Sequence, residues 1–250
     1  MRKSFVLLAV AGTALSFGQT TVECVTFDNA RGKVYAPIRD AASALGWNFG
    51  YRDAEKAVFV NGSKVEKADL RTLFDGTNLL EISAWKKLGA TVGAKDEEGS
   101  YLVTGKDDAL FVIPEKGIEV SIADQEMRGW QGSRLILRTN ISSGKGGSTP
   151  RGSWTLGPAK RKMHYSSLYN NAPMPYAMQI TGNIFVHGYK SVPRYPASHG
   201  CIRMPLKKFN AAKYLFEWAE VGTPISIRKE WSESARRFDV DESSDTQAGE

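Results

Sequence analysis

The chain has 250 residues, of which 42% are hydrophobic, 24% charged and 10% aromatic. This composition supports packed cores and excludes a fibrous or wholly disordered protein, and the length fits one large domain or two smaller ones. The formal net charge of +6 is compatible with an anionic partner, but nucleic acid, anionic lipid and anionic polysaccharide satisfy it equally. With only two cysteines, Cys24 and Cys201, a disulfide scaffold and a four-cysteine zinc module are excluded.

The first 18 residues have the pattern of a secretory signal peptide. Arg2 and Lys3 precede an apolar run over residues 5–15, and cleavage is best placed after Gly18. An uncleaved membrane anchor is the alternative, but the run is shorter than the roughly 20 apolar residues that span a bilayer. We therefore expect an exported protein, in the periplasm or cell wall, with no transmembrane segment after cleavage.

Residues 34–62 and 79–105 repeat each other. In each copy a short amphipathic helix, 40–45 or 82–88, ends at a glycine suited to the left-handed C-cap position. Two short strands joined by a charged turn follow. One such unit cannot bury its apolar face alone, so the two copies are predicted to pack as one small α+β domain over residues 22–106.

Short β-type runs separated by Gly, Pro and Ser dominate residues 107–229. The predicted strands are 109–113, 118–122, 134–139, 153–156, 176–181, 184–187 and 224–228. One helix is clear, with Pro205 in its first turn and an apolar stripe that ends at Ala219. This pattern predicts a mainly β domain, sandwich- or barrel-like. Residues 230–250 are almost devoid of apolar side chains and are predicted to be a disordered acidic tail.

The chemically informative segment contains one cysteine and two of the three histidines. His187 ends an apolar β-type run, and the cysteine closes the run Ser198, His199, Gly200, Cys201. A thiol is mostly protonated at neutral pH and becomes an effective nucleophile when a base lies within reach. Cys201 is therefore the candidate nucleophile and His187 the candidate general base. Gly200 tolerates positive φ, which suits a turn that presents the N–H groups of Gly200 and Cys201 to a developing oxyanion.

Other interpretations of these residues remain open. Cys24 and Cys201 could form a disulfide, because exported proteins with two cysteines often pair them. His187, His199 and Cys201 could bind zinc, although a structural site needs a fourth protein ligand and His164 has no obvious spacing relation to them. His199 could also be a hydrogen-bonded structural residue that only orients the loop.

Several segments match one known family in chain order. They are Ser-Ser-Gly-Lys at 142–145 with Thr-Pro-Arg-Gly-Ser-Trp-Thr at 149–155, Met-Pro-Tyr at 174–176, Val-His-Gly at 186–188 and Ser-His-Gly-Cys-Ile-Arg-Met at 198–204. Together they resemble the L,D-transpeptidase catalytic (YkuD) domain. The loop 189–197 is shorter than is common in that family, which puts substrate contacts from the loop in doubt.

The resemblance implies an enzyme that remodels peptidoglycan without a metal or cofactor. Cys201 would attack the third, diamino-acid residue of a tetrapeptide stem and release the terminal D-alanine, and the amine of a second stem would resolve the thioester into a cross-link. His187 would accept the thiol proton, and the backbone of Gly188 would orient His187. Ser198 and His199 would shape the pocket.

The resemblance also suggests which residues contact the substrate. Arg203 could pair with a stem carboxylate, because its planar donors allow two hydrogen bonds; a surface ion pair is the alternative. Met174 and Tyr176 belong to the segment before the catalytic histidine, and Tyr176 suits a core or groove wall. An active-site lid would fall between residues 160 and 172, where His164, Tyr165 and Tyr169 could touch the stem.

Residues 34–47 resemble the small copper amine oxidase N-terminal-like domain, an accessory module of exported bacterial enzymes. The resemblance implies no copper here, because the segment contains no histidine and one cysteine with scattered carboxylates is not a copper site. Its role would be attachment or positioning at the envelope, or that of a structural spacer.

The expected partners are peptidoglycan stem peptides and anionic cell-wall polymer. Nucleic-acid binding is poorly supported, because only charge favours it and no motif combines aromatic with basic residues. Two alternatives compete with transpeptidation. Water could resolve the same acyl-enzyme, which would make the protein a carboxypeptidase or endopeptidase, or the protein could be a noncatalytic wall-binding protein.

Overall fold

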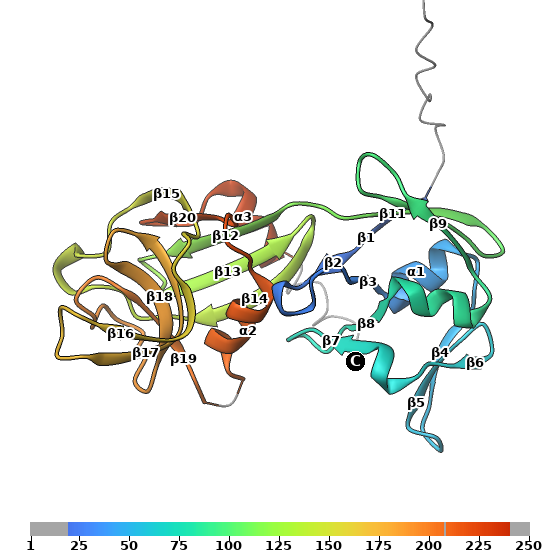
Figure 1. Cartoon of the computed structure of the whole chain (residues 1–250), viewed down its shortest axis with the longest axis horizontal. Coiled ribbons are helices and arrows are strands. Elements are labelled where there is room, and N and C mark those ends of the chain that lie inside the picture. The colour runs from blue at the N-terminus through green and yellow to red at the C-terminus, as the bar shows by residue number, and fades with distance from the viewer. Residues whose placement is uncertain (1–19, 208, 241–250) are drawn as a thin grey trace, which may run out of the picture.

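The computed structural model describes residues 20–207 and 209–240, which form two domains side by side (Figure 1). The predicted signal peptide, residues 1–18, and the end of the predicted tail, residues 241–250, lie outside the described residues. Within the described part of the chain, no helix combines the length and apolar character needed to cross a membrane.

In the N-terminal domain the two repeats share one order of elements, a strand, a helix and a hairpin. The first contains β3 (Val34–Pro37), α1 (Ile38–Ala44), β4 (Phe49–Arg52) and β5 (Ala57–Val60), and the second contains β8 (Asn78–Glu81), η3 (Ile82–Leu88), β9 (Thr91–Lys95) and β10 (Tyr101–Thr104). The helix of the second copy is a 3₁₀ helix rather than an α-helix. Gly46 and Gly89 follow the helices with φ of 65° and 100°, in the left-handed region as expected.

Corresponding strands join the two repeats. β3 and β8 pair antiparallel in the sheet β2-β3-β8-β7, whose outer strands are β2 (Val25–Thr26) and β7 (Leu70–Thr72). β4, β5 and the short β6 (Ser63–Lys64) form a second sheet, and short 3₁₀ helices, η1 (Asp28–Ala30) and η2 (Lys67–Asp69), connect neighbouring strands. The α+β fold predicted for this region is confirmed.

The boundary between the domains lies later than residue 106. β11 (Asp108–Val112) pairs with β10 and, in parallel, with β1 (Thr20–Glu23), so it completes the sheet β1-β11-β10-β9. Its inward residues Ala109 and Phe111 are fully buried in the N-terminal core. The apolar alternation of this strand predicted its conformation, but strand pairing between distant segments decides which domain a strand joins.

The C-terminal domain consists of two sheets around one core. The first has the order β14-β13-β12-β20-β15 and the second the order β16-β17-β18-β19. The strands are β12 (Lys116–Ser121), β13 (Glu126–Gln131), β14 (Arg134–Asn140), β15 (Gly152–Thr155), β16 (Lys160–Ser166), β17 (Ala172–Thr181), β18 (Ile184–Tyr189), β19 (Ile202–Pro205) and β20 (Pro224–Arg228), with the 3₁₀ turn η4 (Lys145–Gly147) before β15. The mainly β fold is confirmed. Strands β13, β16 and β19 were not predicted, because charged residues, a glycine or short length hide their strand pattern.

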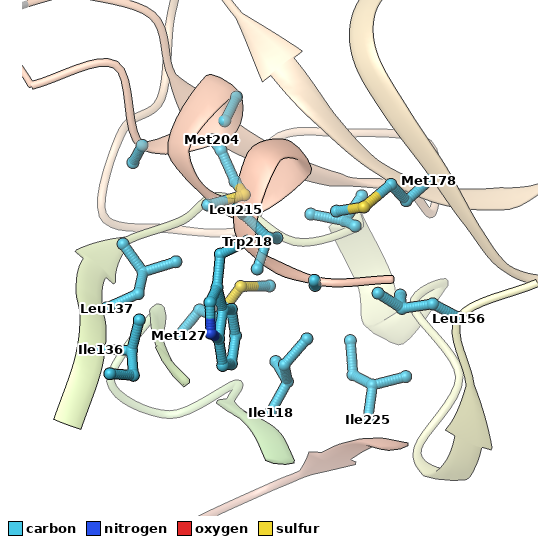
Figure 2. Close-up of a cluster of buried hydrophobic side chains, with 14 of the residues drawn as sticks. Ile118, Met127, Ile136, Leu137, Leu156, Met178, Met204, Leu215, Trp218 and Ile225 are labelled. Carbon is cyan, nitrogen blue, oxygen red and sulfur yellow. The ribbon is translucent and has the colours of Figure 1, made fainter. Parts of the chain in front are cut away.

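Helix α2 (Ala211–Trp218) is shorter than predicted. Pro205 does not start the helix; it ends β19, where it pairs with Tyr189. The helix begins after Asn210, whose side chain accepts a hydrogen bond from Lys213 N at 3.0 Å and so caps the first turn. Trp218 at its other end is fully buried in a core cluster with side chains from both sheets, among them Met127 and Ile225 of the first sheet and Met204 of the second (Figure 2).

The first part of the predicted disordered tail is ordered in the structure. Helix α3 (Glu233–Val240) follows Trp231, whose ring lies 4.3 Å from the Arg128 guanidinium carbon. The buried carboxylate of Glu119 accepts a hydrogen bond from Ser232 N at 2.7 Å, and Ala235 is fully buried. Few apolar residues are enough here, because the preceding domain supplies the surface and the polar partners against which they pack.

Candidate active site

A pocket of about 240 Å³ opens on the C-terminal domain beside the β16–β17 hairpin. Its walls come from that hairpin, from β18 and from the segment that leads into β19. The predicted site residues that line it are His164, Met174, His187, Ser198, His199, Cys201 and Arg203. Residues more than 35 positions apart in the chain thus meet in one cavity.

Parallel pairing of β18 with β19 brings the candidate nucleophile and base together. His187 lies opposite Arg203 in this pair, and Cys201 immediately precedes β19. Helix α2 lies directly behind: a Cβ on Gly188 would approach Leu206 Cδ2 to 2.4 Å and Ala212 Cβ to 3.2 Å. Glycine at position 188 lets Leu206 and helix α2 pack this closely behind the strand that carries His187.

The imidazole of His187 is buried and neutral. Its Nδ1 lies 2.9 Å from Gly188 O, and because a carbonyl only accepts, Nδ1 is assigned the proton, which leaves Nε2 as the base. Burial, the largest effect, lowers the pKa of His187 to about 4, against an opposing contribution from the Gly188 hydrogen bond. A neutral imidazole at physiological pH is the form that can accept a proton from a thiol.

The Cys201 thiol is half-buried and held by backbone groups. Its Sγ lies 3.5 Å from the donor Phe185 N and 3.6 Å from the acceptor Asn183 O. Burial raises the pKa of the Cys201 thiol, whereas the Phe185 N–H and the charge of Arg203 act in the opposite direction. The thiol is therefore protonated in the resting site, and its activation requires a base such as His187.

The turn before Cys201 is closed by the Ser198 hydroxyl. Ser198 Oγ donates to Cys201 O at 2.5 Å and accepts from Gly200 N at 3.0 Å. Thr149 Oγ1 donates to Gly200 O at 2.7 Å, and Gly200 has the positive φ expected of it, 145°. Because Ser198 occupies the Gly200 N–H, the prediction of two oxyanion donors is wrong for Gly200 and stays a prediction for the Cys201 N–H.

Hydrogen bonds from the segment around Ser142 and Ser143 hold this turn in place. Ser142 and Arg203 exchange two backbone hydrogen bonds of 3.0 Å, and Ser143 O accepts from Ser198 N at 2.9 Å. The buried side chain of Gln125 completes the support: its Oε1 accepts from Ser143 N and its Nε2 donates to Ser143 Oγ, both at 2.8 Å. Gln125 is not among the predicted site residues, because one glutamine in a polar turn carries no sequence signal.

Stacked rings line the rest of the pocket. His164 stacks on Phe185 with ring centroids 4.8 Å apart, and Tyr169 stacks on His199 at 4.5 Å. Of the three lid residues suggested by the resemblance, His164 and Tyr169 line the pocket, whereas Tyr165 is mostly exposed and does not. His199 therefore faces the cavity as well as belonging to the turn.

Of two further residues predicted to contact the substrate, Met174 lines the pocket and Tyr176 does not. Met174 is buried and packs with Phe185 and Cys201 in the pocket floor. Tyr176 does not line the pocket, which corrects its assignment as a substrate contact: its ring packs edge-on against Phe216 of α2 at 5.8 Å. Tyr176 has a left-handed φ of 55°, and its side chain packs against the main core of the domain.

Arg203 has its guanidinium over the ring of Tyr189, 4.1 Å from the centroid. Among the described residues no carboxylate forms an ion pair with it, so the alternative of a surface ion pair finds no partner there.

The two cysteines are both free thiols, which overturns the disulfide alternative. Cys24 is fully buried in the N-terminal core, whereas Cys201 lines the pocket of the other domain. As to the zinc alternative, residues 20–207 and 209–240 contain no group of three His, Cys, Asp or Glu side chains placed to bind a metal.

The comparison with protein families assigns the C-terminal domain. Residues 115–227 match the L,D-transpeptidase catalytic domain (YkuD). This match begins just after β11 and ends within β20, in agreement with the boundary seen in the structure. Residues 115–227 therefore form an L,D-transpeptidase catalytic domain. No curated protein sequence matches the chain.

Solved structures similar to the chain include several L,D-transpeptidases. One from Xylanimonas cellulosilytica is 27% identical over 46% of this chain and 61% of its own, with a TM-score of 0.40. One from Stackebrandtia nassauensis is 21% identical over 46% of this chain and 56% of its own, with a TM-score of 0.42. One from Mycobacterium smegmatis is 17% identical over 83% of this chain and 99% of its own, with a TM-score of 0.42. The first two matches span less than two thirds of those chains.

Proposed function

We propose that the protein is an exported cysteine L,D-transpeptidase that cross-links peptidoglycan stem peptides at their third-position diamino acids. The observation that carries the proposal is the placement of Cys201 and a buried, neutral His187 in one pocket of an L,D-transpeptidase catalytic domain. A nucleophile and a base in one partly enclosed cavity are the minimum for acyl transfer through a thioester.

In the first half of the reaction Cys201 Sγ attacks the carbonyl carbon of the third stem residue while His187 Nε2 accepts the thiol proton. The Cys201 N–H faces the developing oxyanion. The bond to the terminal D-alanine then breaks, and the proton on His187 passes to the departing amine. The products are free D-alanine and a thioester between Cys201 and the stem.

In the second half the side-chain amine of another stem attacks the thioester carbonyl. His187 takes a proton from this amine and returns it to the sulfur of Cys201 as the carbon–sulfur bond breaks. The new amide joins two stems, and the enzyme regains its thiol. His187 thus serves as base and acid in turn, which requires the orientation that the Gly188 carbonyl provides.

The rest of the pocket suits a peptide with charged ends. Arg203 lies on the pocket wall with its guanidinium supported by Tyr189 and is the residue that would bind a stem carboxylate. Met174, Phe185 and the ring of His164 offer an apolar wall to the aliphatic part of the stem. The N-terminal domain, which resembles the copper amine oxidase N-terminal-like module, would face anionic cell-wall polymer.

The test is incubation of the protein with purified tetrapeptide muropeptides, followed by mass spectrometry. Cross-linked dimers and free D-alanine from the wild type, absent with Cys201→Ala, are expected. Monomeric tripeptides with D-alanine would instead indicate that water resolves the same acyl-enzyme. Wild-type and Cys201→Ala samples that both leave the substrate intact, with no covalent carbapenem adduct on Cys201, would favour a noncatalytic wall-binding protein.

A further inference from the structure

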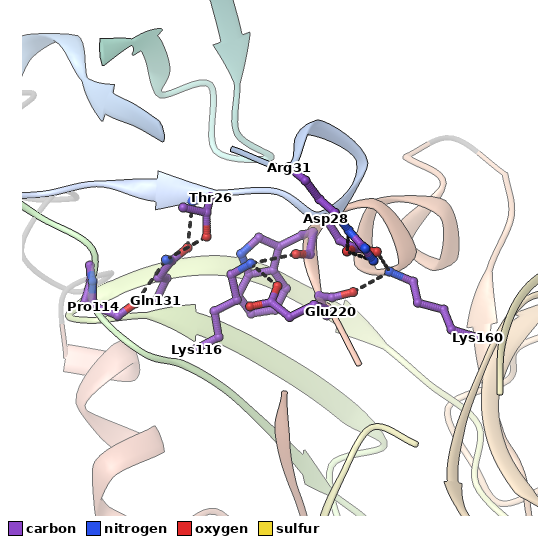
Figure 3. A network of polar contacts seen from close by, with 10 residues as sticks. Thr26, Asp28, Arg31, Pro114, Lys116, Gln131, Lys160 and Glu220 are labelled. Carbon is purple, nitrogen blue, oxygen red and sulfur yellow. Dashed lines mark hydrogen bonds and ion pairs between the residues drawn. The ribbon is translucent and has the colours of Figure 1, made fainter. Parts of the chain in front are cut away.

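A half-buried ion pair connects the N-terminal domain to the base of the active-site hairpin. Lys160, the first residue of β16, donates from Nζ to Asp28 Oδ2 at 2.5 Å and to Ala219 O at 2.6 Å (Figure 3). The side chains of Lys160 and Asp28 are only 9% and 12% exposed. Burial raises the pKa of the Asp28 carboxyl, but hydrogen bonds from Lys160 and Arg31 hold that pKa below its usual value, so Asp28 is ionised.

Lys160 is the first residue of the β16–β17 hairpin, which forms one wall of the pocket. In β16, His164 follows it by four positions and pairs in register with Met174 of β17, and both residues line the pocket. The Lys160 ammonium also lies over the ring of Phe216 in α2, 4.6 Å from the centroid. Lys160 thus holds the base of the hairpin against the end of α2 and against the N-terminal domain together.

Apolar contacts keep Asp28 in place. The neighbouring Phe27 packs edge-on against Tyr214 of α2, with centroids 6.5 Å apart, and against Tyr35 at 5.7 Å. The core cluster of the C-terminal domain contains several buried residues of the N-terminal domain: Val25, Phe27, Tyr35, Leu73 and Leu79. The two domains therefore share one core at this junction, unlike modules joined by a flexible linker.

We propose that Asp28 and Lys160 are positioning residues for the stem-binding wall, which makes the N-terminal domain part of the catalytic unit. The inference rests on the proposed function for its substrate, though not for its structural content. A spacer or tether needs no half-buried ion pair at its junction, because removing two charges even partly from water costs free energy that only good geometry offsets. The pair restricts the junction to one arrangement, and that arrangement fixes where β16 begins.

The kinetic test compares Asp28→Asn and Lys160→Met with Asp40→Asn as the matched control. Asp40 of α1 pairs with Arg134 of β14. This ion pair also joins the two domains, but Arg134 lies in the first sheet, which does not contain the β16–β17 hairpin. Loss of the Asp28–Lys160 pair is expected to raise the KM for the stem about tenfold with kcat changed less than about twofold. A merely structural role would lower the active fraction, and hence apparent kcat, with KM unchanged. Asp40→Asn is expected to leave both constants unchanged.

A substrate-free measurement separates this inference from the proposed function. Hydrogen exchange of the backbone amides in residues 161–172 is expected to accelerate about tenfold in Asp28→Asn and in Lys160→Met, and to be unchanged in Asp40→Asn. This result supports the positioning role even if the wild type shows no turnover, in which case only the transpeptidase proposal fails. The inference is overturned if folded Asp28→Asn and Lys160→Met both exchange at the wild-type rate, or if exchange in Asp40→Asn accelerates equally.

Discussion

Cys24 and Cys201 place the same side chain in two different chemical environments, one in each domain. Cys24 follows β1 in the N-terminal core, where its Sγ lies 3.8 Å from Val22 O and burial raises the thiol pKa to about 12. Cys201 is also desolvated, but the Phe185 N–H and the charge of Arg203 oppose the rise in its pKa. Burial alone makes a thiol inert, whereas partial burial beside a donor, a cation and a base makes a usable nucleophile.

The largest expected effect comes from removing one thiol or the other. Cys201→Ala is expected to lower the rate of D-alanine release by at least about 10³-fold, because no other group can carry the acyl intermediate. Cys24→Ala is expected to keep near wild-type activity. Release assays on both variants check this, and a comparable loss in Cys24→Ala would contradict the separation of the two sites.

Alkylation sharpens the same comparison without any substrate. Iodoacetamide at pH 8 is expected to modify Cys201 in the folded protein and to modify Cys24 only after unfolding, with a rate difference of about 10³-fold from thiolate fraction and access combined. Peptide mapping of the two sites before and after guanidinium treatment measures this. Equal labelling of Cys24 in the folded protein would show that its burial is transient.

The base distinguishes the Cys201 region from any merely exposed thiol. His187→Gln is expected to reduce turnover about 10²- to 10⁴-fold, because proton transfer from the thiol loses its acceptor. His199→Gln serves as the control, since His199 lines the same pocket but is assigned no proton transfer. A loss in His199→Gln as large as that in His187→Gln would reassign the base.

Acid should destabilise the Cys201 region through His187. The pKa of His187 is lowered to about 4 in the folded protein from its ordinary value of 6.5, so the unfolded chain binds more protons between these values. The stability contribution is complete above pH 6.5 and is lost as pH falls towards 4, about 3 kcal/mol in total. Urea unfolding of wild type and His187→Gln at pH 7 and pH 4.5 isolates this contribution, which the variant is expected to lack.

The smallest expected effect concerns the glycine behind the base. Gly188→Ala would push against Leu206 and Ala212 and is expected to lower the free energy of unfolding by about 1–3 kcal/mol. Gly50→Ala tests glycine loss where the backbone is not left-handed and the added methyl group meets no neighbour. Thermal melts of both variants check the prediction, and turnover by Gly188→Ala reports whether His187 has moved.

The sequence predicted the parts of the site that are local. A histidine at the end of an apolar strand and a cysteine after a Ser-His-Gly run carry their chemistry in their residue types and spacing. The roles of Gln125 and Tyr176 were out of reach. Gln125 acts through Ser143, which is 18 positions away, and the direction of the Tyr176 side chain depends on a φ of 55° that no propensity indicates.

The sequence by itself determined the mainly β character, the two repeats and the identity of the candidate nucleophile and base, because alternation, glycine placement and thiol chemistry are properties of short segments. Only the tertiary structure decided that β11 belongs to the first domain, that residues 230–240 pack on the second, and that Asp28 meets Lys160. These outcomes depend on pairing and burial between segments more than 100 residues apart in two of the three cases, where contact free energies rather than local preferences determine the structure.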